Sequence, residues 1–297
     1  MKIMSLAALE ARLSAYKRLW RRAFVKGPLT RFVFEFIAFG IKQGWACLFG
    51  ALMLLLLLGS FLVYPADAPL ARYDFITVCA LAIQIAMLGL KLETWEEAGV
   101  ILAFHLVGTV MELYKTHMGS WIYPEASVLR IGDVPLFSGF MYACVGSYIA
   151  RVWRLFHFEF DRFPPLWAQG LLALGVYINF FTHHFMLDVR WGLFFVSALL
   201  YLPCVIWFRP DQARRCMPLG IGLFLVALFI WFAENIATYA NAWRYPGQDQ
   251  TWHWVSLNKL GAWYLLMIIS FVLVAAIHDT RLRLSLKTRH NDKRRQP

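Results

Sequence analysis

Apolar segments, each long enough to cross a lipid bilayer, follow one another along most of the chain. A transmembrane helix needs roughly 20 consecutive apolar residues. Soluble domains carry about 45–50% apolar and about 25% charged residues, whereas this chain is 60% hydrophobic and 16% charged. We therefore predict an all-α, polytopic bundle of about eight transmembrane helices, surrounded by membrane lipids. The expected spans lie at about 44–64, 73–92, 98–115, 135–153, 165–184, 190–208, 217–240 and 259–279.

The segment before the first span has a different character. Leu6, Leu9, Leu13, Tyr16, Trp20 and Phe24 recur at helical spacing among lysines and arginines. This pattern is typical of an amphipathic surface helix on an anionic cytoplasmic leaflet. The apolar run 32–64 is too long for one span, so residues 32–43 form an entry segment. The expected parts are the basic N-terminal segment 1–31, a transmembrane domain 32–280 with halves of about 32–155 and 165–280, and a basic tail 281–297.

Basic residues are distributed unevenly between the alternate connections. The N-terminus, the tail and the connections after every second span carry 22 Lys and Arg residues, against 6 on the other side. Cytoplasmic loops hold the excess of positive charge. We expect a multi-pass inner-membrane protein with both termini in the cytoplasm. This distribution also accounts for the net charge of +11, so no nucleic-acid partner is predicted.

Two segments share one motif. Residues 112–124 and 234–246 both read E-x3-T-x4-W-x-Y-P, and every matched position is offset by 122 residues. An offset of four helices gives both copies the same orientation in the membrane. The motif predicts a parallel 4+4 internal repeat, as in other membrane proteins built from repeats.

The motif supplies most of the candidate site. Carboxylates within spans are expensive and usually face the protein interior or water, so Glu112 and Glu234 are the candidate catalytic groups. His105, Thr109, Glu112 and Thr116 form one stripe on a helix face. We expect an outward-facing polar pocket between the third, fifth and seventh spans. Its candidate substrate-binding residues are His105, Thr116, Trp121, Tyr123, His183, Asn235, Thr238, Trp243 and Tyr245.

The residue types allow three classes of function. A carboxyl group in an apolar site resists ionisation, because desolvation disfavours the charged form, so it can donate a proton. Beside Trp and Tyr faces, which attract cations, it could protonate a carbon–carbon double bond of a lipid or isoprenoid substrate. The same residues suit a proton-coupled small-molecule transporter. A structural membrane protein, whose glutamates only tie helices together, is the third reading.

Neither a metal site nor a disulfide framework is predicted. Carboxylates with His183 and His184 are possible ligands of zinc or iron. The sequence holds no HxxxH, HExxH or ExxH pair, and adjacent histidines on a helix point about 100° apart. The five cysteines stand singly without a CxxC pair, and we expect them to be buried and inert. The sequence implies no particular cofactor.

The chain resembles the YoaT-like integral membrane proteins, a family of unknown function. The resemblance is carried by Phe39-Gly40-x-Lys42-Gln43 with Cys47-Leu48-Phe49, by the two motif copies, and by Lys259-Leu260-Gly261-x-Trp263. Residues 112–136 are more distantly similar to the carotenoid hydratase family, through Glu112, Gly119, Tyr123 and Val134-Pro135-Leu136. That similarity covers about 30 residues and implies roles for Glu112 and Tyr123. This chain departs from the hydratase pattern by Trp121 in place of a Tyr, by fewer glycines and by the duplicated motif.

Overall fold

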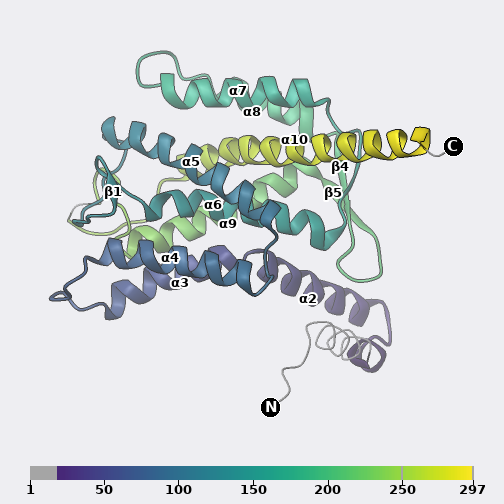
Figure 1. The fold of residues 1–297 in the computed structure, drawn as a ribbon, viewed down its shortest axis with the longest axis horizontal. Helices are drawn as coiled ribbons and strands as arrows, with labels where there is room; N and C mark the ends of the chain where they lie inside the picture. The colour runs from purple at the N-terminus through teal and green to yellow at the C-terminus, as the bar shows by residue number, and fades with distance from the viewer. Residues whose placement is uncertain (1–18, 249, 296–297) are drawn as a thin grey trace.

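The computed structural model describes residues 19–248 and 250–295. Apart from the first two long helices, which follow one another with a bend of 68°, successive helices run in opposite directions, so their connections collect at two ends of an elongated bundle (Figure 1). We call the end that carries residues 118–136, 183–189 and 240–256 the motif end, and the end that carries residues 157–165 and 202–218 the tail end. The helices are α2 (Pro28–Ala46), α3 (Leu48–Val63), α4 (Arg72–Gly89), α5 (Trp95–His117), α6 (Phe137–Phe156), α7 (Leu166–Thr182), α8 (Arg190–Tyr201), α9 (Leu219–Tyr239) and α10 (Leu257–Arg295).

Several helices are suited to a bilayer. Among the described residues, four helices are long and apolar enough to cross a membrane: α4, α5, α9 and residues 257–277 of α10. The bent pair of α2 and α3 would add a fifth span if the two helices cross as one. Helix α6 has 20 residues but is not among these candidates, while α7 and α8 are shorter, with 17 and 12 residues. The protein is therefore a helical membrane protein, and the count of eight spans stays a prediction.

Short strands depart from the all-α expectation. At the motif end, β1 (Arg130–Ile131) pairs with β2 (Val134–Pro135). At the tail end, β3 (Glu159–Asp161), β4 (Val205–Phe208) and β5 (Arg215–Pro218) form an antiparallel sheet in that order. The expected span 190–208 is wrong at its end: the helix stops at Tyr201. Pro203 has no amide proton with which to continue the helix, and residues 205–208 pair as a strand instead.

The N-terminal expectations fall partly outside the described residues. Residues 1–18, which carry most of the expected amphipathic pattern, are not described. Residues 19–24 are helical and expose Trp20 and Phe24. The long apolar run is divided as expected, but at Cys47 rather than at residue 43, and α2 and α3 meet at 68°.

The five cysteines are all free, but the expectation that they are buried is wrong in part. Cys204 is buried, Cys79 and Cys144 are half-buried, and Cys47 and Cys216 are exposed on the protein.

A buried ion pair joins four elements towards the tail end. Arg151 of α6 donates to Glu93 at 3.0 Å, and neither side chain has any exposed surface. Ser147 and Gln84 also donate to the Glu93 carboxylate, at 2.7 and 2.6 Å. A second guanidinium nitrogen of Arg151 donates to the carbonyl of Trp45 at 3.2 Å. The pair ties α2, α4 and α6 to the connection before α5.

Helix α4 holds the loops of the motif end in place. The Asp74 carboxylate accepts the backbone amides of Val128 and Leu129, at distances from 2.7 to 3.0 Å. Arg72 donates to both oxygens of Glu125 and to the carbonyl of Asn241 at 3.1 Å. The two loops that follow the motif helices are thereby fixed against one another.

Candidate functional site

The two copies of the motif end in turns of the same shape. After α5, Gly119 has φ +66° and its amide donates to the Thr116 carbonyl at 3.0 Å. After α9, Asn241 has φ 54° and its amide donates to the Thr238 carbonyl at 3.1 Å. Left-handed backbone of this kind favours Gly and is tolerated by Asn. Each turn sends the following Trp-x-Tyr segment back across the end of its helix.

These turns allow each glutamate to meet the tyrosine of its own copy. The Glu112 carboxylate accepts the Trp121 indole N–H at 2.7 Å and the Tyr123 hydroxyl at 2.6 Å, both on Oε2. Its Oε1 accepts the Tyr142 hydroxyl from α6 at 2.8 Å. Glu112 is only 5% exposed, so three donors replace the water that the carboxylate has lost.

Glu234 is held in a related but not identical way. Its Oε1 accepts the hydroxyl of Tyr245, and its Oε2 accepts the indole N–H of Trp263 from α10 at 2.7 Å. Trp263 thus supplies the indole donor that Trp121 supplies to Glu112. Trp243, which matches Trp121 in the motif, is buried and lines the same cavity as both glutamates.

Both glutamates line one cavity of about 190 Å³. The exposed Asn258 belongs to its lining, so the cavity opens at the motif end. Lys259 points into the region between the two copies: its ammonium lies 4.1 Å from the ring centre of Tyr245 and 5.3 Å from that of Trp121. The aromatic faces that ring the cavity therefore already hold a cation.

The structure brings together most of the predicted site residues. The cavity is lined by seven of the eleven: Glu112, Trp121, Tyr123, His183, Glu234, Trp243 and Tyr245.

The remaining four predicted residues do not line this cavity. His105 packs against Gly139 and tilts onto the Phe140 ring, with centroids 4.7 Å apart. The hydroxyl of Thr116 is buried and has no hydrogen-bond partner in the described structure. Asn235 and Thr238 instead bind the loop before α10. The side-chain oxygen of Asn235 accepts the Val255 backbone N–H at 2.9 Å, and the hydroxyl oxygen of Thr238 accepts the Trp252 indole N–H at 3.1 Å.

Sequence reasoning placed Lys115 and Lys259 near the expected pocket, but it missed Tyr142 and Trp263, which lie outside the two motif copies. Tyr142 comes from α6, and Trp263 comes from the second turn of α10. Lys259 and Trp263 are four residues apart and hence share a helix face. That spacing, shortly after the second motif copy, is the signal that could have found Trp263.

A basic group forms one wall of the cavity. Lys115, only 3% exposed, places its ammonium 3.3 Å from His183 Nε2 and 2.9 Å from His184 Nε2. His183 Nδ1 lies 2.9 Å from the Asn179 carbonyl. A carbonyl only accepts, so Nδ1 carries the proton and Nε2 offers its lone pair to Lys115. Arg190 completes the wall and donates to Asp188 at 2.5 Å.

The loop residues of the site have shifted pKa values. Burial, and then the Glu112 charge, raises the pKa of Tyr123 well above its usual value, and burial and Glu234 do the same for Tyr245. Burial and then the Lys115 charge lower the pKa of His184. Both tyrosines therefore remain hydroxyl donors at neutral pH.

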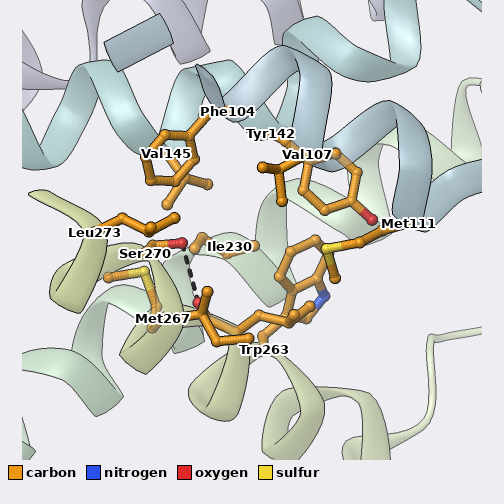
Figure 2. A pocket seen from close by; sticks show the side chains of 13 residues that line it. Phe104, Val107, Met111, Tyr142, Val145, Ile230, Trp263, Met267, Ser270 and Leu273 are labelled. Atoms are coloured by element: carbon orange, nitrogen blue, oxygen red, sulfur yellow. Dashed lines mark hydrogen bonds between the residues drawn. The ribbon is translucent and has the colours of Figure 1, made fainter. Parts of the chain in front are cut away.

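A second, apolar crevice of about 30 Å³ adjoins the cavity. Tyr142, Trp263 and Leu266 line both spaces. Figure 2 shows Tyr142 and Trp263 at one end of the crevice, with their polar atoms on the side away from Phe104 and Leu273. The crevice lies between α5, α6, α9 and α10. A polar cavity with an apolar extension into the bundle suits an amphiphilic molecule.

No cluster of three or more His, Cys, Asp and Glu side chains that could hold a metal ion occurs in the part of the chain that the structure describes. The site thus consists of carboxylates, aromatic donors and basic side chains.

The fold and the site define a helical membrane protein with a buried pair of glutamates beneath a basic cavity wall. The chain belongs to the family described as Protein of unknown function (DUF817), whose model matches residues 35–271. It is 40% identical to the "Uncharacterized protein YoaT" of Bacillus subtilis (strain 168) over 251 residues, which cover 84% of this chain and 94% of the relative. No solved structure matches significantly.

Proposed function

We propose that this protein is a membrane enzyme that performs acid–base chemistry on a lipid or isoprenoid. The observation that carries the proposal is the single cavity lined by both Glu112 and Glu234. Two carboxyl groups that share a confined site disfavour simultaneous ionisation, so one of them stays protonated. The pair can then offer an acid and a base to the same substrate.

The donors around Glu112 suit the role of an acid. When its proton is transferred to one carbon of a double bond, a new C–H bond forms and the neighbouring carbon becomes cationic. The carboxylate left behind is stabilised by Trp121, Tyr123 and Tyr142. The short sequence resemblance to the carotenoid hydratases points to Glu112 and Tyr123 as site residues, and the Tyr123 hydroxyl donates to Glu112 at 2.6 Å.

The aromatic faces and the second glutamate complete the chemistry. The faces of the Tyr245 and Trp121 rings attract positive charge. The Lys259 ammonium lies over both rings in this structure. Glu234 can remove a proton from an adding water molecule, which gives hydration, or from an adjacent carbon, which moves the double bond. Both outcomes return one proton for the one donated.

We further propose a parallel 4+4 arrangement with eight passes, both termini in the cytoplasm, and the motif end on the outer side of the inner membrane. The two turns of the same shape and the alternating directions of the helices from α3 to α10 support this reading. The 22-to-6 distribution of basic residues supports the orientation.

The test compares lipid and pigment extracts of a deletion strain with those of its parent by mass spectrometry. The deletion strain is complemented with the wild-type protein, Glu112→Gln or Glu234→Gln. We expect a lipid precursor to accumulate in the deletion strain, and only the wild type to remove it. Identical extracts, together with proton-driven uptake of a solute into proteoliposomes that either variant abolishes, would replace this proposal by the transporter reading.

A further inference from the structure

We infer that the basic wall of the cavity binds the phosphate head group of an amphiphilic substrate. In this inference the basic wall of Lys115 and Arg190 acts together with Lys259, which lines the same cavity, and His183 and His184 contact the Lys115 ammonium. This inference deepens the function proposed above. The identification of the ligand as a substrate rests on that function, but the existence of the anion site does not.

The first argument is that neither lysine forms a salt bridge among the described residues, although Glu234 and Glu112 attract Lys259 at longer range. Among the described residues, neither Lys115 nor Lys259 lies within 4.0 Å of a carboxylate. The neighbours of the Lys115 ammonium are imidazole nitrogens and the Phe180 ring, whose centre lies 4.4 Å away. Buried charges are costly unless they are paired, and the C-terminal dipole of α5 compensates only part of one charge.

The second argument is that like charges converge. Lys115 interacts electrostatically with Lys259 and Arg190, which repel it, and with Asp188. Asp188 is already bound to Arg190 and to the amide of Asn179 at 3.1 Å. Three cations at one cavity, against Asp188 and the one glutamate that stays ionised in the proposed function, leave a surplus of positive charge that favours an anionic ligand.

The third argument concerns the shape of the ligand. A phosphate monoester carries about −1.5 to −2 charges at neutral pH and three acceptor oxygens, which suits two ammonium groups and a guanidinium. Tyr142 and Trp263 connect the cavity to the apolar crevice. A prenyl or alkyl chain attached to the phosphate would begin at Glu112 and Glu234 and continue into that crevice.

The experiment measures equilibrium binding by the purified full-length protein in a neutral detergent. Isothermal titration and thermal shift are recorded with geranyl phosphate, geraniol and inorganic phosphate. The variants are Lys115→Met and Lys259→Met, which remove a charge from the cavity lining. Arg130→Met is the matched control, because Arg130 lies at the same end, outside the cavity lining, and pairs with Asp133 at 2.7 Å.

We expect geranyl phosphate to bind more tightly than either geraniol or inorganic phosphate. Each Lys→Met variant should weaken this binding by about tenfold to a hundredfold, which corresponds to one charge-assisted contact. Arg130→Met should bind as the wild type does. Without ligand, the Lys115→Met protein should melt at the same temperature or higher, since a buried unpaired charge has been removed.

Three results would count against the inference in different ways. Equal binding of inorganic phosphate and geranyl phosphate would leave an anion site but reject the lipid source. Equal binding of geraniol and geranyl phosphate, or no effect of either lysine variant, would reject the anion site itself. Because the assay involves no turnover, failure of the extract comparison would reject the enzyme function without altering these binding constants.

Discussion

Ile122 and Arg244 donate their backbone amides to each other's carbonyls, both at 2.9 Å. These residues occupy the same place in the two motif copies, 122 positions apart. A residue that pairs with its own counterpart in an antiparallel bridge is what a two-fold axis between the copies would produce. Trp121 and Tyr245 meet beside this bridge, with ring centroids 6.0 Å apart. The bridge closes the two Trp-x-Tyr segments over the glutamates.

The first prediction concerns Glu112→Gln and Glu234→Gln, which we expect to fold normally and to be inactive. A Gln at 112 can keep its oxygen towards the Trp121 N–H, while its amide donates to the Tyr142 hydroxyl oxygen. At 234 the oxygen can face Trp263 and the amide can face Tyr245. The loss of stability should be about 1 kcal/mol or less, measured by thermal unfolding in detergent.

If the glutamates only tie helices together, both Gln variants would complement the deletion strain fully. Glu→Ala serves as the destabilising comparison, because it leaves the buried Trp and Tyr donors without an acceptor at about 1–3 kcal/mol per group.

The second prediction concerns alkaline pH. The pKa values of Tyr123 and Tyr245 are raised well above 10 in the folded protein, while the unfolded chain releases these protons near pH 10. Their contribution to stability is therefore complete below about pH 10 and is lost as the pH rises further. Thermal unfolding from pH 8 to pH 11 should show a shallower alkaline decline in Tyr123→Phe/Tyr245→Phe than in the wild type. Parallel curves for the two proteins would contradict this prediction.

The third prediction concerns the buried pair of Arg151 and Glu93. Removal of one partner leaves the other charge buried, so Arg151→Met should lower the free energy of unfolding by about 3–5 kcal/mol. The double variant Glu93→Gln/Arg151→Met should recover part of that loss. Arg154→Met is the control, since Arg154 is 48% exposed and pairs with Glu97 at 3.4 Å; its cost should stay within about 1 kcal/mol. Equal costs for Arg151→Met and Arg154→Met would show that the buried pair is not structurally important.

The fourth prediction concerns orientation. Single cysteines at Thr251 and Arg162, in a background free of the five native cysteines, should react differently with a membrane-impermeant thiol reagent in intact spheroplasts. We expect labelling at position 251 and none at position 162 until the membrane is opened. The reverse pattern would place the cavity on the cytoplasmic side.

The sequence predicted the parts of the site that one helix and its following turn determine. Glu112 and Tyr123 lie 11 residues apart and meet through a local turn, as Glu234 and Tyr245 do. The partners supplied by other helices could not be predicted this way, because helix neighbours depend on tertiary packing. His105, which belongs to the predicted polar stripe, does not line the cavity for a related reason. An added Cβ at Gly139 would lie 2.5 Å from His105 Nδ1. The glycine therefore lets α6 pack closely against this part of α5.

The parts of the fold that could be predicted are the helices whose length and apolar composition are sufficient to cross a membrane. The membrane environment of α4, α5, α9 and α10 follows from length and hydropathy alone. The sheet at the tail end was missed because its strands have three or four residues, and the pairing of β3 with β4 joins segments separated by more than 40 positions. Strands this short show too little alternation to be recognised without their partners.

At the left-handed position the two turns of the same shape carry different residues, Gly119 and Asn241, and these two residues have different roles. Gly119 merely permits its backbone conformation. Asn241 adopts the same conformation, and its side chain also binds two neighbouring residues. Its side-chain amide donates to Glu125 at 3.0 Å, and its side-chain oxygen accepts Arg244 Nε–H at 2.6 Å. An Asn241→Gly exchange would preserve the path of the chain but remove the side-chain contacts with Glu125 and Arg244. The two loops above the cavity would then still be joined through Arg72 and through the backbone pair of Ile122 and Arg244, but by fewer side-chain contacts, which makes the contact between them less rigid.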